Sequence, residues 1–323
     1  MDHKVYQSYR KELNVVSVKS YKGYMHLGVF FALTTLGISL SLQSSYLLYL
    51  LGQAFLILSF LNGQILLHEM GHGFFIQNKK VNHFFGYIVA LSPIIPYKPW
   101  VLIHGQHHRW SGNKHKDPTT VSKSFEDLKE SEKKVMNFCW KYWIPIFGLS
   151  YSVRAFWNFK MLKSLFPKSQ KSIIASMILP VIFYGVLVSL SPLLFLKVWL
   201  PAYYLFMAFS EPLLFSQHVH VDQADTRDEN FEHDSSYHVK DHDVFSRNLV
   251  FPEWVSNWIL LGFNKHAIHH IFPNLPGYEF SRIKETFPNT MDWKTWYSLS
   301  KSTDAATLLF KTNKQTGLIK GQV

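Results

Sequence analysis

The chain of 323 residues contains one cysteine, Cys139, and only 17% charged residues. A single thiol excludes an intrachain disulfide framework and a zinc or iron–sulfur site built on cysteines, because each of these needs several. A bound metal would therefore depend on His, Asp or Glu. The sequence also lacks an arginine-rich arm and a helix-turn-helix pattern, so its net charge of +11 does not indicate nucleic-acid binding. We interpret the excess as charge that faces anionic membrane lipid.

The scarcity of charge accompanies 47% hydrophobic and 16% aromatic residues, which is apolar for water-soluble domains. A helix that crosses the hydrocarbon core of a membrane needs about 20 apolar residues. The segments that approach this length are Met25–Leu42, Tyr46–Leu67, Ile173–Leu190 and Val198–Phe215. A fifth apolar stretch, Phe84–Ile95, contains a proline and is short, so we expect an interfacial or re-entrant element there.

The short connections within each pair of apolar segments predict two tight hairpins. Basic residues flank the outer ends of the pairs, which indicates that the termini and the central loop are cytoplasmic. We expect no removable signal peptide, since the chain begins with polar residues. The prediction is one all-α integral membrane domain, comprising an N-terminal segment (1–24), the first hairpin (25–67), a cytoplasmic region (68–171), the second hairpin (173–215) and a second cytoplasmic region (216–323).

Histidine occurs 17 times, and much of it is grouped in three short boxes. Spacings of three and four residues place side chains on one face of a helix, which suits metal binding. The boxes consist of His68 and His72; His104, His107 and His108; and His266, His269 and His270. All three follow predicted cytoplasmic ends of the spans, as do His218 and His220. Eight or more imidazoles exceed the four ligands of one zinc ion, so two metal ions fit the count.

This pattern resembles the membrane fatty acid desaturase family, whose hallmark is three boxes of the form H-x3-4-H, H-x2-3-HH and H/Q-x2-3-HH. The resemblance runs from about Met25 to Phe280 and includes Trp100 before the second box. Lys265 departs from the aromatic residue that many members have there. The resemblance implies two iron ions (Fe2+/Fe3+), with ligands His68, His72, His104, His107, His108, His218, His266, His269 and His270.

By the same resemblance, the protein is expected to be a dioxygen-dependent desaturase that introduces a double bond into a fatty acyl chain of a lipid or thioester. The chain has no glycine-rich flavin or nicotinamide fingerprint and no fused haem module. A separate electron donor of the ferredoxin or cytochrome b5 type is therefore implied. The expected location is the bacterial inner membrane or the endoplasmic reticulum, with the active site on the cytoplasmic side and membrane lipid around the spans.

Several alternatives remain open at this point. The first box, from His68 to His72, also reads as the H-E-x-x-H of zinc metalloproteases, in which Glu69 would activate water. That reading leaves the other two boxes unexplained, so we interpret Glu69 as a partner that holds an imidazole in orientation. A hydroxylase or carotenoid ketolase would use related boxes, and a non-catalytic metal carrier is a third class.

Three minor assignments complete the predictions. Asn264 either orients a metal ligand or caps a surface helix, and the role of His220 is open. His233, His238 and His242 lie in an acidic run, which is more often a solvated loop than a set of ligands.

Overall fold

The computed structural model describes residues 3–14, 18–120, 123–221, 245–285, 287 and 289–319. His233, His238 and His242 lie outside these described residues. The chain forms two compact units: the span unit (Val18–Ile103 and Phe147–Ser210) and the histidine unit (Met1–Ser17, His104–Ile146 and Glu211–Val323). Two helices, α5 (Tyr97–Trp110) and α11 (Leu200–His218), begin in the span unit and end in the histidine unit.

The span unit contains the long apolar helices that the sequence predicts. Within the described part of the chain, four helical stretches are long and apolar enough to cross a membrane: Ser20–Ser41, Tyr46–Gly71, Pro167–Leu190 and Pro192–His218. They include α2 (Ser20–Ser41), α3 (Tyr46–Gly71), α9 (Gln170–Leu190) and α11. The expected apolar helices are thus confirmed, with ends that differ by a few residues. The paired hairpins and the cytoplasmic orientation stay predictions.

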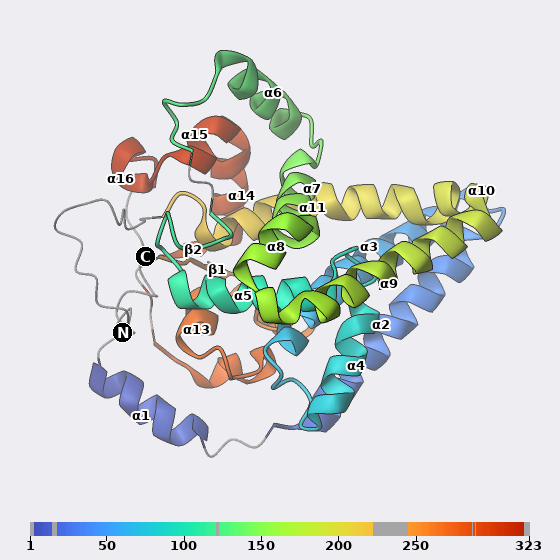
Figure 1. The fold of residues 1–323 in the computed structure, drawn as a ribbon, viewed down its shortest axis with the longest axis horizontal. Helices are drawn as coiled ribbons and strands as arrows, with labels where there is room; N and C mark the ends of the chain where they lie inside the picture. Colours follow the sequence, from blue (N-terminus) through green and yellow to red (C-terminus); the bar gives the residue numbers. More distant parts are fainter. Residues whose placement is uncertain are drawn as a thin grey trace. The chain divides into compact units, whose positions relative to one another are not determined.

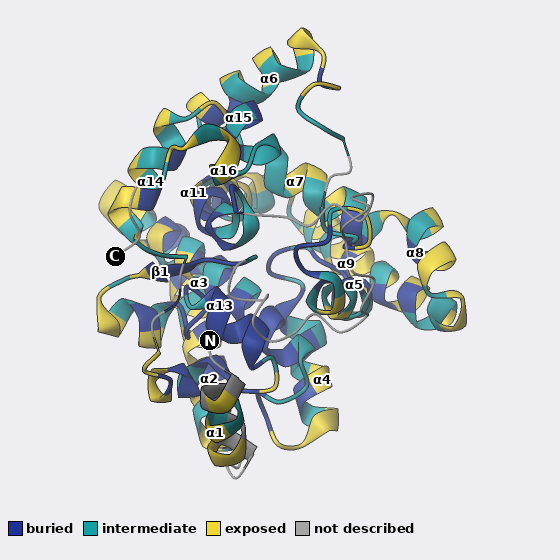
Figure 2. Cartoon of the chain, turned by 90° about the vertical axis from the view of Figure 1, so that its left-hand side faces the viewer, coloured by how far each residue is buried: buried dark blue, intermediate teal, exposed yellow. Residues whose placement is uncertain are grey.

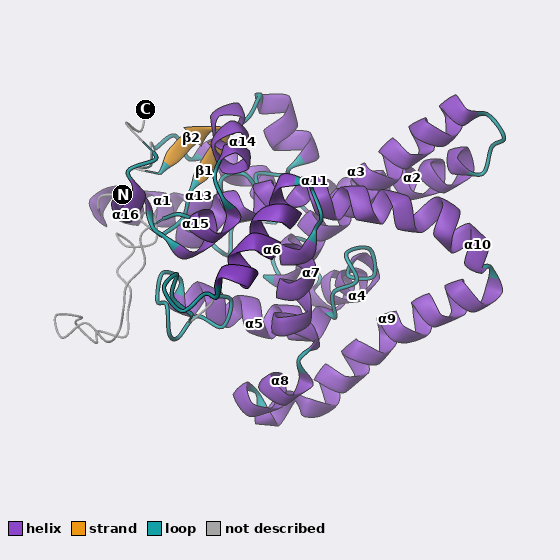
Figure 3. Cartoon of the chain, turned by 90° about the horizontal axis from the view of Figure 1, so that it is seen from above, coloured by secondary structure: helices purple, strands orange, loops and turns teal. Residues whose placement is uncertain are grey.

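Helices α2 and α3 run side by side, as Figures 1 and 3 show. Glycines allow this close approach. A Cβ at Gly52 of α3 would lie 2.4 Å from the main-chain nitrogen of Ser41, and a Cβ at Gly37 of α2 would lie 2.7 Å from Cγ of Leu56. Because real Cβ atoms do not tolerate such distances, larger residues at these positions would force the two helices apart.

The centre of the span unit lies between α3 and the start of α11. Leu56 and Phe60 of α3 pack with Val198, Ala202 and Phe206 in one buried cluster. Within an apolar 18-residue segment of the stretch that contains α3, 56% of the residues are buried, whereas only 17% are buried in the corresponding segment of the stretch that contains α9. Since α9 is also the most apolar of the four stretches, its exposed side chains suit a lipid environment rather than water.

The fifth apolar stretch contains a short helix followed by an irregular turn. Helix α4 (Lys79–Val89) ends before Pro93, and Ile94 has a positive φ of 57°. Aromatic side chains satisfy the carbonyl groups of this turn: Tyr184 donates to Leu91 O (2.7 Å), Tyr203 to Pro93 O and Trp157 Nε1 to Ile94 O (both 3.1 Å). These donors allow non-helical backbone to persist in an apolar unit, where an unpaired carbonyl would be costly.

Shorter helices complete both units. In the span unit these are α7 (Ile146–Ser152), which begins at the boundary residue, α8 (Phe159–Leu165), α10 (Pro192–Leu194), a 3-10 turn (Pro167–Ser169) and π-helical turns (Val153–Trp157 and Phe195–Trp199). The histidine unit adds α1 (His3–Asn14), α6 (Glu130–Lys141), α13 (His266–Ile271), α14 (Trp293–Ser302), α15 (Ala305–Phe310), α16 (Asn313–Thr316), a π-helical turn (Val255–Ile259) and a 3-10 helix (Gly277–Arg282). Strands β1 (Asn248–Val250) and β2 (Thr290–Asp292) pair in parallel, as Figure 3 shows.

Candidate metal centre

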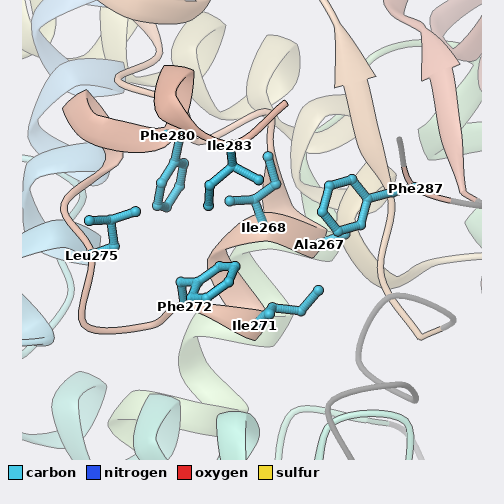
Figure 4. Packing of buried hydrophobic residues seen from close by; sticks show 8 residues of the cluster. All are labelled: Ala267, Ile268, Ile271, Phe272, Leu275, Phe280, Ile283 and Phe287. Atoms are coloured by element: carbon cyan, nitrogen blue, oxygen red, sulfur yellow. The ribbon is translucent and has the colours of Figure 1, made fainter. Parts of the chain in front are cut away.

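The third histidine box lies on α13, a helix of only six residues. Such a short helix is not stable alone, so its surroundings must hold it. Asn248 Oδ1 accepts a hydrogen bond from Ala267 N at the first turn (2.8 Å). Ala267, Ile268 and Ile271 pack into a cluster completed by Phe272, Leu275, Phe280, Ile283 and Phe287, which Figure 4 shows. Every residue of α13 is buried, as its dark colour in Figure 2 indicates.

The second box occupies the C-terminal half of α5, and His218 is the last residue of α11. Within the histidine unit, four imidazole nitrogens converge. The Nε2 atom of His218 lies 3.0 Å from that of His107, 2.8 Å from that of His266 and 3.0 Å from that of His270. We call His107, His218, His266 and His270 the histidine tetrad; one ring nitrogen from each lies within 4.8 Å of all the others.

The protons of two tetrad members can be located from their outer contacts. His107 Nδ1 lies 2.7 Å from Oδ2 of the buried Asp117, and His218 Nδ1 lies 2.9 Å from the carbonyl oxygen of Phe245. A carboxylate and a carbonyl oxygen accept hydrogen bonds, so both Nδ1 atoms donate. In neutral imidazoles, both Nε2 atoms then carry lone pairs. Two lone pairs only 3.0 Å apart repel each other, and a bound cation would remove that repulsion.

A third member of the tetrad, His270, also keeps a lone pair. Burial lowers the pKa of His270 well below its usual value, and the neighbouring histidines His108, His266, His218 and His107 lower it further. His270 therefore stays neutral near pH 7 and keeps a lone pair for a metal. The donor set also fits a metal, because imidazole nitrogens that converge within 4.8 Å of one another are suitable ligands for zinc or iron.

The remaining histidines of the second and third boxes form a second group. His108 Nε2 lies 3.1 Å from Nε2 of His104 and 2.9 Å from Nε2 of His269. The ring of His108 also stacks on that of His270, with centroids 4.3 Å apart and planes at 27°. His108 thus connects the second group to the tetrad, and the histidine unit brings together seven of the nine predicted ligands.

The first box lies in the span unit, at the end of α3. His68 is in the last turn and His72 caps the helix, and their ring centroids are 5.3 Å apart. His68 Nδ1 lies 3.2 Å from Oε1 of Glu69, and both residues are buried. This contact supports the interpretation of Glu69 as the partner that orients an imidazole. The same contact occupies the Glu69 carboxylate, which in a zinc protease would activate water.

Close packing holds the first box in place. The ring of Trp100 lies against that of His68 at 5.7 Å, and a Cβ at Gly71 would lie 2.0 Å from Cζ3 of Trp100. The Met70 carbonyl, near the end of α3, accepts hydrogen bonds from Asn82 Nδ2 (2.7 Å) and from the Tyr97 hydroxyl (3.1 Å). Only glycine at position 71 therefore permits Trp100 to contact the box in this way.

Sequence reasoning missed Asp117, which lies ten residues after His107 and belongs to no box. Thr119 donates to Asp117 Oδ1 through both its main-chain nitrogen (2.8 Å) and its hydroxyl (2.7 Å), so the carboxylate is held rigidly. An outer carboxylate of this kind fixes the tautomer of a ligating imidazole. The signal available in the sequence was the turn-forming run from Asn113 to Asp117, which by itself does not name a partner.

The contacts of two other residues bear on assignments that the sequence left open. Asn264 is buried, so the surface helix cap is wrong; its amide donates to Leu249 O (2.7 Å) and accepts from the Ser256 hydroxyl (2.9 Å). It supports the backbone that precedes α13. His220 has a positive φ of 61°, and its Nε2 lies 2.7 Å from the hydroxyl of Thr316 in α16. The structure therefore gives His220 a contact distinct from those of the tetrad.

Together, membrane-length apolar helices and a convergent group of histidines define a helical membrane protein with a candidate metal centre. A family model described as fatty acid desaturase matches residues 44–298. The chain belongs to the fatty acid desaturase family, which confirms the predicted resemblance.

Individual relatives are distant in sequence. The chain is 24% identical over 233 residues to an endoplasmic reticulum omega-3 fatty acid desaturase of Vigna radiata var. radiata, which covers 66% of this chain and 58% of that protein. It is 24% identical over 240 residues to a chloroplastic, temperature-sensitive sn-2 acyl-lipid omega-3 desaturase (ferredoxin) of Arabidopsis thaliana, with 68% and 52% covered. An acyl-lipid omega-3 desaturase (cytochrome b5) of the same plant is 25% identical over 236 residues, with 66% and 57% covered. The chain thus spans little more than half the length of these relatives.

Proposed function

We propose that this protein is a di-iron desaturase that introduces a double bond into a fatty acyl chain of a lipid or thioester. The observation that carries the proposal is the histidine tetrad. The Nε2 atoms of His107 and His218 lie 3.0 Å apart, and a bound cation would relieve the repulsion between their lone pairs. Imidazole nitrogens suit iron as well as zinc. The names of the relatives, all of which are fatty acid desaturases, support an acyl substrate.

We assign one ion to His107, His218, His266 and His270. The second ion is assigned to the second group, His104, His108 and His269. By the family resemblance, His68 and His72 of the first box are also iron ligands. Glu69, Asp117 and the Phe245 carbonyl orient His68, His107 and His218 through their Nδ1 atoms.

Iron supplies what the reaction requires, because it changes oxidation state and so can use dioxygen where zinc cannot. An alkane C–H bond offers no acidic proton to a general base, so acid–base chemistry at Glu69 alone could not form the alkene. The overall reaction balances as –CH2–CH2– plus dioxygen, two electrons and two protons giving –CH=CH– and two waters. The chain's own residues hold the imidazoles and keep His270 neutral by burial.

The two electrons would come from a separate donor. Of the relatives, one carries ferredoxin and another cytochrome b5 in its name, so both donor types are candidates here. The four apolar stretches suit an integral membrane protein, and we place the metal centre on the cytoplasmic side, in the bacterial inner membrane or endoplasmic reticulum, because basic residues flank the outer ends of the predicted hairpins.

Two measurements on the full chain test this function. Metal analysis of purified protein should give about two irons per chain; one zinc accompanied by peptide cleavage would instead establish the protease reading. Mass spectrometry of lipids from a host fed defined acyl chains should show the loss of two hydrogens. A gain of one oxygen atom would identify a hydroxylase, and an unchanged profile with both irons and an active donor would count against either enzyme.

The assignment of the first box needs its own test, because His68 and His72 lie in the span unit. Replacing His72 with Ala should lower the iron content below about two per chain. If His72→Ala retained both ions with wild-type affinity, the first box would not be a ligand. His83, whose ring contacts the Tyr97 hydroxyl (2.7 Å), provides a matched control histidine in the same unit.

A further inference from the structure

The last turn of α11 carries His218 and is held by a buried arginine that the metal-centre assignment does not use. Arg247 is 2% exposed. Its Nη1 donates to the carbonyl oxygens of Ser216 and Val219 (both 3.0 Å), and its Nη2 donates to that of His220 (3.3 Å). The Ser216 carbonyl is one of those that the last turn of a helix leaves without a partner, and Val219 and His220 directly follow the last residue of α11. Arg247 therefore caps α11 with a fork of donors.

The surroundings of Arg247 compensate for burying its charge. The guanidinium lies 4.3 Å from the ring centroid of Trp296 in α14, a cation–π contact. The C-terminus of α11 adds the negative end of the helix dipole. Burial lowers the pKa of Arg247 to about 9, so the group is still protonated near pH 7. A hydrophobic side chain would fill the same space at a lower desolvation cost, which leaves the capped carbonyls as the reason for an arginine.

The same short segment also sets the outer contact of His218. Phe245, two residues before Arg247, provides the carbonyl that accepts from His218 Nδ1. The main-chain nitrogen of Arg247 donates to Gln217 O (2.9 Å). Segment 245–247 therefore forms hydrogen bonds with residues before and after His218. A further contact acts earlier on the helix, where Trp296 Nε1 donates to Pro212 O (2.7 Å).

We propose that Arg247 is a positioning residue of the metal centre, which fixes the His218 imidazole toward the tetrad by clamping the end of α11. This inference rests on the proposed function, because it takes the tetrad as a metal site. A ligating nitrogen must be held within about 0.5 Å of its place. A released helix end would fray and move His218 by more than that, whereas His107, His266 and His270 lie on other helices.

The test compares Arg247→Met, Arg247→Lys and His218→Ala with wild-type protein, using Co2+ alone as the probe. Metal per chain and the visible absorption of bound Co2+ are measured in detergent, with helix content recorded by circular dichroism. Arg247→Met should weaken Co2+ binding at the tetrad about 10–100-fold, the range seen when an outer partner of a ligand is lost. Arg247→Lys, which keeps the charge but not the fork, should give an intermediate loss and an altered spectrum.

Two further variants separate positioning from general stability. Asn137→Ala removes a side-chain cap from the first turn of α15, where Asn137 Oδ1 accepts from Ala306 N (3.1 Å), and should leave Co2+ binding unchanged. The double variant Arg247→Met with His218→Ala should bind Co2+ as His218→Ala does, because the arginine acts through that histidine. If Arg247→Met does not fold, the Co2+ spectrum of Arg247→Lys tests the positioning role in its place.

The outcomes distinguish this inference from the proposed function. Wild-type Co2+ affinity and spectrum in folded Arg247 variants would overturn the positioning role and leave the metal centre intact. Additive losses in the double variant would also overturn it. A wild-type protein that binds no Co2+ at the tetrad would overturn the metal centre itself, and the positioning role with it.

Discussion

The ends of α3 and α11 perform the same task with different chemistry. Each helix ends close to histidines and is held through its last carbonyls. At α11 the holding group is the charged Arg247, whereas at α3 it is the neutral amide of Asn82 and the hydroxyl of Tyr97, whose pKa burial raises. Each group supplies hydrogen bonds to carbonyls that its helix end leaves without partners.

The imidazoles of the two regions both contact a carboxylate, but at different distances. His107 Nδ1 meets the Asp117 carboxylate at 2.7 Å, while His68 Nδ1 meets that of Glu69 at 3.2 Å. Asp117 is further held by Thr119. At α3, orientation depends more on packing, through Trp100 and the absence of a side chain at Gly71. The comparison indicates that imidazole orientation depends mainly on hydrogen bonds at the tetrad and mainly on steric fit at the first box.

The largest effect is expected from removing a tetrad ligand. His266→Ala should abolish desaturation and remove one of about two irons, because three imidazoles lose the fourth member of their cage. Iron content and the lipid product profile measure this. His220→Asn is the matched control, since Asn tolerates the left-handed backbone and His220 contacts Thr316 instead. Equal loss of iron in both variants would contradict the assignment of the tetrad.

Asp117→Asn tests the hydrogen-bonded side of the comparison. The amide retains the shape but not the charge, so His107 loses its anionic partner and the tetrad should bind metal about 10–100-fold more weakly. Metal titration of the purified variant measures the change. Thr119→Val, which keeps Asp117 but removes one of its supports, should give a smaller loss. Unchanged metal affinity in Asp117→Asn would show that the carboxylate does not set the tautomer.

Gly71→Ala tests the steric side. The new Cβ would lie 2.0 Å from Cζ3 of Trp100, so the ring must move away from His68 at a cost of about 1–3 kcal/mol. Thermal unfolding in detergent should show a lower midpoint. Gly28→Ala in α2 is the control, because a Cβ there meets no atom within 4 Å among the described residues and alanine favours a helix. Equal midpoints for the two variants would refute the packing argument.

Glu69→Gln should have the smallest effect. The contact with His68 is longer than that of the Asp117 pair, so we expect less than a tenfold loss of metal affinity and measurable remaining desaturation. Product analysis and metal titration check both. In a zinc protease the same change would remove the base that activates water, so complete inactivation with full metal content would revive that alternative.

Much of the fold could be predicted because its signals are local. A long run of apolar residues identifies a membrane-length helix from a few neighbouring positions, and the expected and observed ends of α3 differ only by the last turn, Leu67 against Gly71. Helical spacing likewise predicts which histidines share a face. Asp117, Arg247 and the role of Asn264 could not be predicted, because each depends on a partner brought close only by folding.

The amino-acid sequence alone determined the membrane-length helices, the composition of the boxes and, through their spacing, membership of the desaturase family. The tertiary structure decided which nitrogens converge within the histidine unit, which of their protons are committed to outer partners, and that His220 contacts α16. The physical reason is the distance along the chain over which each interaction acts. Hydropathy and helical period act over one or two turns, whereas the direction of an imidazole is set by one hydrogen bond from a residue distant in the chain.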